Sequence, residues 1–219
     1  MTGAVLWDMD GTLVDSEEYH WLAWRDSMAS EGITLTHDQF IRTFGQRNDS
    51  ILPQWLGAGV SPERILRVGD AKEELYRKLV REGRLAPLPG AMEWIRRLHH
   101  QGWVQAIASS APRANIDAVL EVIGLAGQFQ AEVSAEDVTK GKPDPQVFLT
   151  AAARLNMPPA RCIVVEDAVP GVEAARRASM RCIGVSRNGG LAADVVVRSL
   201  ADLPEDAFEV LGRKPYTIG

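Results

Sequence analysis

The feature that most constrains the fold is a set of four short apolar runs that lie far apart in the chain, at residues 4–7, 103–108, 162–165 and 182–185. Each run is apolar at nearly every position, whereas a strand with one face in water alternates apolar and polar residues. Segments long enough for helices separate the runs, so strands and helices alternate along the chain. The pattern predicts a doubly wound, Rossmann-like α/β core built on a buried parallel sheet.

One stretch, residues 16–85, interrupts this alternation because it contains only helical patterns. A first helix is expected to end at Gly32, and Thr36 with Gln39 forms the capping box that starts a second. Ser61 precedes a proline and starts a third helix, because a serine cap followed by proline is typical of a helix N-terminus. The stretch is therefore expected to fold as a helical bundle.

This layout divides the chain into two parts. We expect residues 1–15 and 86–219 to form the α/β core, and residues 16–85 to form an inserted helical cap domain. The chain returns to the core through residues 85–90, a stiff segment rich in proline and glycine, beside the outgoing segment. Two linkers that lie close together would act as a hinge, so we interpret the cap as a lid.

Charge and hydropathy exclude several classes of partner. The chain has 24 basic and 29 acidic residues, a net charge of −5 without any block of Lys/Arg, so nucleic acid is not expected as a partner. No apolar run approaches the ~20 residues that cross a bilayer, so no membrane contact is expected. The N-terminus lacks a secretory pattern, and Cys162 and Cys182 lie inside apolar runs, as expected for buried free thiols in a reducing cytoplasm.

A pair of acids follows the first apolar run. Asp8 and Asp10 stand two residues apart, and Gly11 then allows the chain to turn. Ligands bind at the carboxyl ends of strands in open parallel sheets, which is where these carboxylates are predicted to lie. The alternative is a solvated acidic turn. A calcium-binding EF-hand loop does not fit, because Gly11 comes two places too early and Tyr19 replaces the bidentate glutamate.

Three further features follow later strands or precede a helix. Ser109 and Ser110 end the second run, where a hydroxyl can also serve only as a helix cap. Lys142 stands in a stiff loop between glycine and proline, where a surface lysine is the alternative. Glu166 and Asp167 end the third run, and two acids at the end of a buried strand are costly unless they bind a cation.

These features, in this order along the chain, resemble the haloacid dehalogenase-like superfamily of phosphatases and phosphomutases. The resemblance covers nearly the whole chain, and the helical insert matches the small cap of that superfamily. Within it, residues 15–20 are similar to the branch that contains β-phosphoglucomutase and small sugar-phosphate phosphatases.

The resemblance implies a role for each core residue. Asp8 would be the nucleophile that forms an aspartyl-phosphate, and Asp10 the general acid and base. Thr12 would support the loop and orient Asp10, with Gly11 at the turn. Mg²⁺ would be held by Asp8, the Asp10 backbone carbonyl, Asp167 and Glu166, the last directly or through water, while Ser109, Ser110 and Lys142 would hold the phosphoryl oxygens.

The resemblance also points to substrate residues in and near the cap. His20 and Lys72 match positions of the mutase, although His20 is equally compatible with a packed or surface histidine. Arg47, or Asn48 beside it, falls where the mutase carries a phosphate-binding arginine. The mutase uses a Ser-Lys pair for its second phosphate, whereas here Ala111 and Pro112 stand in its place, followed by Arg113. The second-phosphate site is thus missing or rebuilt around Arg113 and Arg47.

The leading hypothesis is therefore an Mg²⁺-dependent phosphatase that acts on a small phosphorylated metabolite, such as a sugar phosphate. A β-phosphoglucomutase-type phosphomutase is the alternative. A non-catalytic regulator that binds a phosphorylated metabolite is a remote third, against which the presence of both Asp8 and Asp10 argues. The sequence does not reveal the preferred ester or the breadth of the substrate range. A monomer is the simplest expectation, although no motif determines the oligomeric state.

Overall fold

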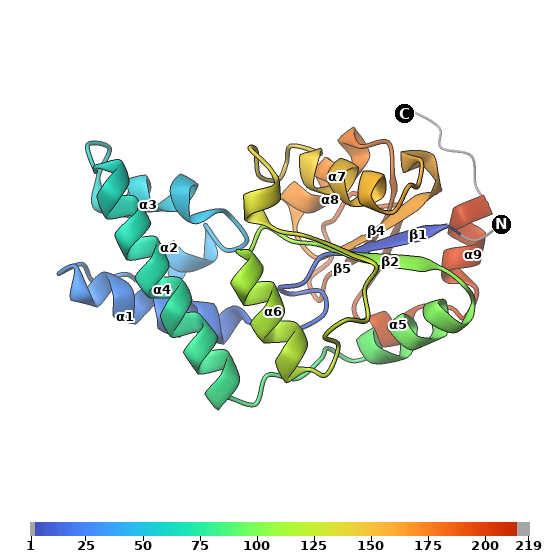
Figure 1. Cartoon of the computed structure of the whole chain (residues 1–219), viewed down its shortest axis with the longest axis horizontal. Coiled ribbons are helices and arrows are strands. Elements are labelled where there is room, and N and C mark those ends of the chain that lie inside the picture. Colours follow the sequence, from blue (N-terminus) through green and yellow to red (C-terminus); the bar gives the residue numbers. More distant parts are fainter. Residues whose placement is uncertain (1–2, 214–219) are drawn as a thin grey trace.

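The chain folds into a parallel sheet covered by helices, with a separate group of helices to one side, as the computed structural model shows over residues 3–213 (Figure 1). The sheet has six strands in the order β3-β2-β1-β4-β5-β6, and all neighbours are parallel. Its strands are β1 (Ala4–Trp7), β2 (Val104–Ala108), β3 (Ala131–Val133), β4 (Cys162–Glu166), β5 (Arg181–Val185) and β6 (Val195–Val197).

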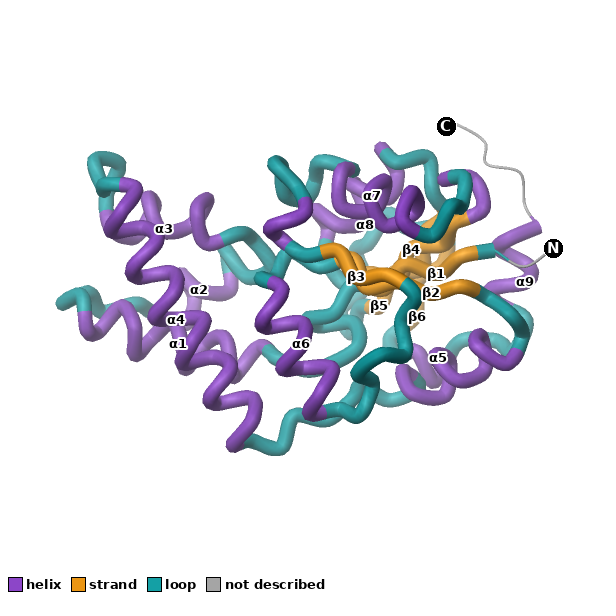
Figure 2. The backbone as a smooth tube through the Cα atoms, in the orientation of Figure 1, coloured by secondary structure: helices purple, strands orange, loops and turns teal. Residues whose placement is uncertain are grey.

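Helices cover both faces of this sheet (Figure 2). On one face, α5 (Ala91–His100), α6 (Arg113–Val122) and α9 (Ala207–Arg213) contribute to one apolar cluster, in which Trp7 of β1 packs near Phe208. On the other face, α7 (Gln146–Arg154) and α8 (Val169–Arg177) pack on a second cluster around Leu6 and Phe148. Successive β1 residues point to opposite faces, and both faces are covered, which explains the uninterrupted apolar run. The predicted doubly wound α/β fold is confirmed.

Two strands were not predicted from the sequence. The edge strands β3 and β6 are three residues long, and such short runs carry too little periodicity to identify. Helix α7 begins at Gln146, whose backbone N–H donates to Asp144 Oδ1 at 3.1 Å.

The segment between β1 and α5 contains four helices, α1 (Glu17–Ser30), α2 (His37–Ile41), α3 (Asn48–Leu56) and α4 (Pro62–Glu82). The predicted capping box at Thr36 and Gln39 is present, and the Ser61 hydroxyl accepts from the Arg64 backbone N–H at 3.3 Å. The sequence did not predict α3, because that helix contains Pro53 and has no side-chain cap.

The four helices share an apolar cluster that includes Trp24, Phe40 and Leu52. The far end of α4 belongs to the core as well, since Tyr76 and Val80 join the cluster on the sheet. We propose that residues 16–85 are a cap domain, because this segment has an apolar cluster of its own and every strand of the described chain lies outside it.

The two segments that join the cap to the core run side by side. The Leu88 backbone N–H donates to the Leu13 carbonyl at 2.8 Å, and Val14 forms an antiparallel bridge with Pro87. Both connections therefore lie next to each other, which is the geometry that a hinge requires. Hinge motion of the cap stays a prediction.

The cysteines and the helix lengths test two further expectations. Cys162 and Cys182 are buried and form no disulfide, as predicted. Among residues 3–213, no helix combines the length and apolarity needed to cross a membrane.

The N-cap of α4 can be tested by a substitution at Ser61. Ser61→Ala removes the acceptor for the Arg64 N–H, so we expect the free energy of unfolding to fall by about 1 kcal/mol. Ser50→Ala, at an exposed position inside α3, serves as the control and should leave stability unchanged or slightly higher, because alanine favours helices. Urea unfolding measures the stability of both variants. Equal effects of the two substitutions would contradict the assignment of Ser61 as the N-cap of α4.

Candidate functional site

Three neighbouring strands end at the same edge of the sheet and bring the predicted residues together. Trp7 of β1 is in register with Ile107 of β2 and Val165 of β4, so the residues that follow lie side by side. These include Asp8, whose backbone N–H donates to the Val165 carbonyl at 3.0 Å, and Glu166, the last residue of β4.

A buried lysine joins two of these carboxylates. Lys142 Nζ lies 2.5 Å from Asp8 Oδ1 and 2.7 Å from Glu166 Oε1, and only 6% of its side chain is exposed. Charge-assisted hydrogen bonds of this length inside a protein are strong, and they fix the lysine between the two strand ends. The alternative of a solvated surface lysine is therefore wrong.

The carboxylates of Asp8, Glu166 and Asp167 form a cluster in which one oxygen of each lies within 4.8 Å of the others. Two glycines make the cluster possible. A Cβ on Gly11 would lie 2.1 Å from Asp167 Oδ2, and one on Gly171 would lie 1.7 Å from Glu166 Oε1. Three hard oxygen donors held this closely match the ligand preference of Mg²⁺.

The electrostatics of the cluster also fit a cation. Burial, together with the charge of Glu166, raises the pKa of Asp8 to about 7 despite the adjacent Lys142. Burial, followed by the charges of Glu166 and Asp8, raises the pKa of Asp167 well above its ordinary value. Burial acts to lower the pKa of Lys142, but Asp8 and Glu166 outweigh it and raise that pKa. One lysine does not balance three carboxylates, and a divalent cation would favour their ionised forms.

Asp10 turns toward the cap and lies among hydrogen-bond donors. Its Oδ1 accepts from the Ser16 hydroxyl at 2.5 Å and from Tyr76 at 3.3 Å, and lies 3.3 Å from His20 Nε2. Burial acts to raise the pKa of Asp10, but His20, Ser16 and Lys72 outweigh it and lower the pKa below its ordinary value. In this arrangement Asp10 is a carboxylate held at the junction of core and cap.

A chain of polar contacts continues from Asp10 through the cap. Lys72 Nζ lies 3.0 Å from His20 Nδ1 and 2.9 Å from Glu73 Oε1. An ammonium group cannot accept a hydrogen bond, so His20 accepts at Nδ1 and carries its proton at Nε2, toward Asp10. His20 stacks on Tyr76 with ring centroids 4.0 Å apart, so it is both packed and hydrogen-bonded.

Glu73 connects these polar contacts to the core. Its Oε1 accepts from Asn48 at 2.7 Å, and its Oε2 accepts from Asn115 at 2.5 Å. Asn115 lies on α6, is fully buried, and also accepts from Arg77 at 3.0 Å. These contacts tie α3 and α4 of the cap to α6 of the core.

The remaining core residues lie around the cluster. The Thr12 hydroxyl donates to Asp167 Oδ1 at 3.4 Å. Its hydrogen bond therefore goes to a carboxylate of the cluster, whereas Asp10 was the expected partner. Ser109 is buried and its Oγ accepts from the Ala111 backbone N–H at 3.1 Å, while Ser110 is half-buried. Both serines line the cavity described next.

A cavity of about 290 Å³ lies between the cap and the core. The carboxylate cluster, Asp10 and Lys142 line its inner end, and His20, Arg47 and Lys72 line it from the cap. Four residues in and near the cap were predicted to contact substrate: His20, Arg47, Lys72 and Arg113. Of these, only Arg113 is not part of the cavity wall.

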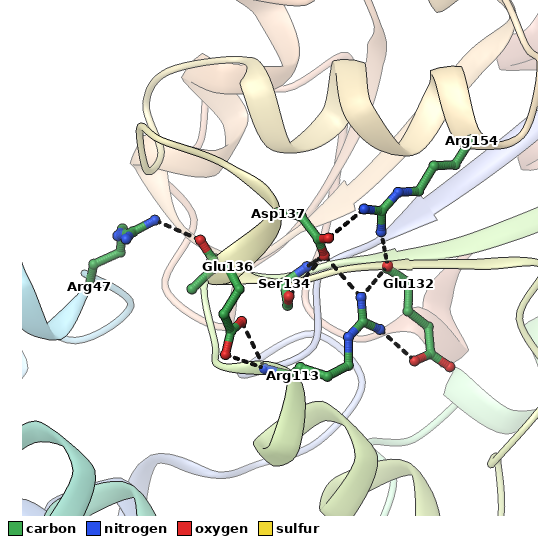
Figure 3. A network of polar contacts seen from close by, with 8 residues as sticks. Arg47, Arg113, Glu132, Ser134, Glu136, Asp137 and Arg154 are labelled. Carbon is green, nitrogen blue, oxygen red and sulfur yellow. Dashed lines mark hydrogen bonds and ion pairs between the residues drawn. The ribbon is translucent and has the colours of Figure 1, made fainter.

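The two arginines are held by the loop around the short helix Ala135–Asp137 (Figure 3). Arg47 Nη1 donates to the Ala135 carbonyl at 3.0 Å and to the Val138 carbonyl at 3.3 Å. Arg113 forms ion pairs with Glu132 at 2.8 Å and with Asp137 at 2.9 Å. Arg113 is thus bound away from the cavity, which does not favour its predicted part in a second-phosphate site.

Several residues of the site were not predicted from sequence. No sequence motif points to Tyr76, Glu73 or Asn115. Their positions depend on the packing of α4 against α6, which no local pattern of residues reveals.

Comparison with known proteins agrees with this geometry. The family model described as "Hydrolase: haloacid dehalogenase-like hydrolase" matches residues 2–179. Beta-phosphoglucomutase of Bacillus subtilis is 34% identical over 209 residues, covering 91% of each chain. Hexitol phosphatase B of Escherichia coli is 34% identical over 223 residues, covering 95% of this chain and 96% of that protein.

A longer relative and a solved structure add to this likeness. The chain spans only 18% of the protein SUPPRESSOR OF QUENCHING 1 of Arabidopsis thaliana, with 36% identity over 189 residues. A crystal structure of CbbY from Rhodobacter sphaeroides, in complex with xylulose-(1,5)bisphosphate, superposes with a TM-score of 0.83. The two are 27% identical, and the superposition covers 93% of this chain and 96% of that one.

The close approach at Gly171 yields a prediction about the cluster. Gly171→Ala would place a methyl group on the Glu166 carboxylate, which Lys142 and the Ala168 N–H hold in place. We expect a loss of about 2 kcal/mol in the free energy of unfolding, the usual cost of overpacking. Gly59→Ala, where the added atom meets nothing within 4 Å, is the matched control. If denaturant unfolding gave the two variants the same stability, the crowding inferred at Gly171 would be wrong.

Proposed function

Because the chain belongs to the haloacid dehalogenase-like hydrolases, a family of phosphatases with phosphomutase relatives, we propose that it is an Mg²⁺-dependent phosphatase. Its substrate would be a small phosphorylated metabolite, such as a sugar phosphate. The observation that carries the proposal is the cluster at the strand ends, where Asp8 lies against Lys142 and beside Glu166 and Asp167, with Asp10 two residues along the chain.

Asp8 is the proposed nucleophile. Its carboxylate would attack the phosphorus and form an aspartyl-phosphate as the bond to the leaving alcohol breaks. A phosphate dianion repels a carboxylate, so attack requires positive charge nearby. Lys142 supplies one charge directly at Asp8 Oδ1, and the Ser109 hydroxyl and Ser110 line the same end of the cavity, where they can hold phosphoryl oxygens.

Mg²⁺ would be held by Asp8, Glu166, Asp167 and the Asp10 backbone carbonyl, and would supply charge neutralisation at the phosphoryl oxygens. Thr12 donates to Asp167 and would keep that ligand in place. Gly11 and Gly171 leave the space that the carboxylates occupy.

Asp10 is the proposed general acid and base. A phosphate dianion beside Asp10 opposes its negative charge and favours the protonated form, which can donate to the leaving oxygen. In the second step Asp10 would take the proton of the water that attacks the aspartyl-phosphate. His20, Ser16 and Tyr76 hold Asp10 in position, so that its orientation depends on the cap.

A phosphomutase is the second candidate, because a beta-phosphoglucomutase is among the relatives. Such an enzyme passes the phosphoryl group to a sugar hydroxyl and must also hold a second phosphate. Ala111 and Pro112 replace the polar pair expected for that phosphate, and Arg113 lies outside the cavity wall. These observations favour water as the acceptor. A bisphosphate is also a ligand to consider, since the related CbbY structure contains one.

The proposed nucleophile can be tested by one substitution. Asp8→Asn keeps the size of the side chain and removes its nucleophilic oxygen charge, so we expect turnover to fall at least ~10³-fold, comparable to the loss of a covalent catalyst. Asp26→Asn, a surface position of α1, is the control and should keep full activity. Steady-state phosphate release measures both, and full activity of Asp8→Asn would mean that the nucleophile is another residue.

The choice between the two reactions is tested by ³¹P NMR with Mg²⁺ and β-glucose 1-phosphate, primed with glucose 1,6-bisphosphate. We expect inorganic phosphate to accumulate, and chelation of Mg²⁺ to stop it. Glucose 6-phosphate that grows without free phosphate would identify a phosphomutase. A panel of sugar and sugar-alcohol monophosphates follows if this ester is not used, and no phosphate release from any of them would overturn the proposed function.

A further inference from the structure

We propose that the outer part of the cavity selects esters with a single phosphate and rejects bisphosphates, with Glu73 and Glu136 as the specificity-determining residues. The outer part is the wall contributed by the cap helices, by the N-terminus of α6 and by Glu136. The inference rests on the proposed function and narrows its substrate class to monophosphates whose far end is uncharged.

The charges of the outer wall oppose a second anionic group. Four carboxylates line it, those of Asp49, Asp70, Glu73 and Glu136, against two basic side chains, Arg47 and Lys72. Glu73 is only 6% exposed, and although burial acts to raise its pKa, Lys72 and His20 lower it, so the buried side chain carries its negative charge. A second phosphate would therefore enter a region that is already negative.

Both cations of the outer wall are already engaged. Lys72 is buried, donates to Glu73 at 2.9 Å, and lies 3.0 Å from His20. Arg47 donates to two carbonyls of the core and pairs with Asp49 at 3.1 Å. A second phosphate that took the Nη1 donors of Arg47 would remove them from these oxygens, and the backbone carbonyls would lose their partner.

The N-terminus of α6 is closed to an anion as well (Figure 3). A helix N-terminus attracts anions because its first backbone N–H groups have no partner within the helix. Here the Glu136 carboxylate accepts from the backbone N–H of Arg113, the first residue of α6, at 3.0 and 3.2 Å. Glu136 thus occupies the position that a phosphate would take, while the Arg113 side chain is paired with Glu132 and Asp137.

The rest of the outer wall suits an uncharged group. Apolar side chains of the cap line it, namely Trp24, Phe40, Phe44, Ile51, Ile65 and Leu66. A sugar or sugar alcohol could present its carbon skeleton to these side chains and its hydroxyls to the carboxylates, which accept hydrogen bonds. A phosphate would lose its hydration here without a cation to replace it.

The test compares a monophosphate with its bisphosphate, using fructose 6-phosphate with fructose 1,6-bisphosphate and glucose 1-phosphate with glucose 1,6-bisphosphate. Binding to the Mg²⁺-loaded Asp8→Asn protein is measured by calorimetry, so it does not depend on turnover. In parallel, phosphate release by the unaltered protein gives kcat/KM. We expect each monophosphate to bind at least about tenfold more tightly, as a unit charge close to a dianion can produce.

Three charge-removing variants, one of them a control, assign the effect. Glu136→Gln, at an exposed position, should raise affinity for the bisphosphates roughly tenfold and leave the monophosphates unchanged. Glu121→Gln removes the same charge from α6 outside the cavity, on a side chain that is 70% exposed, and should change neither. Glu73→Gln should also raise affinity for the bisphosphates; its melting temperature is measured first, because the residue is buried and holds Lys72 and Asn115.

The outcomes separate the inference from the proposed function. The inference would be overturned if the bisphosphates bound as tightly as the monophosphates or more tightly. It would also be overturned if none of the four compounds bound. A Glu136→Gln variant that behaves like Glu121→Gln would overturn it as well. Absence of phosphate release from every monophosphate would overturn the proposed function instead, even where the binding preference is observed.

Discussion

The structure depends on a buried arrangement of charge, in which Lys142 lies between Asp8 and Glu166 at the ends of two neighbouring parallel strands. Carboxylates are rarely buried, because each one loses its hydration, yet here three lie close together and two of them contact this lysine. The sheet makes this possible by ending β1 and β4 at the same level, and two glycines leave space for the side chains. The residual negative charge is a physical reason to expect a cation.

The cap is connected to this cluster through polar contacts and not by packing alone. Asp10 contacts His20, His20 contacts Lys72, and Lys72 contacts Glu73, which reaches Asn115 on the core helix α6. The chain of contacts thus leaves the core at the proposed acid and base and returns to it at α6. Movement of the cap on its paired linkers would change these contacts, so the surroundings of Asp10 and the position of the cap are physically coupled.

The cavity therefore has two ends with different electrostatics. At the inner end, carboxylates are grouped around a lysine and fit a divalent cation, so a phosphate can be bound there. At the outer end, carboxylates exceed cations, both cations are paired, and Glu136 occupies the N-terminus of α6. On the selectivity proposed above, phosphate is attracted to the inner end only. This asymmetry is a property of the whole cavity, since its charges come from the cap and from four separate segments of the core.

The sequence by itself determined the four inner strands of the sheet, three of the four cap helices and the residues of the inner cluster. Buried parallel strands are apolar throughout, and charged residues directly after them must lie at one edge, so Asp8, Glu166 and Asp167 could be placed together without coordinates. It missed α3, β3 and β6, whose local patterns are weak. Only the tertiary structure decided the outer cavity: that Glu73 meets Asn115, that Arg113 turns away and that Glu136 covers α6. Those contacts join residues from separate elements, and their geometry depends on how the elements pack, which the spacing of residues along the chain does not encode.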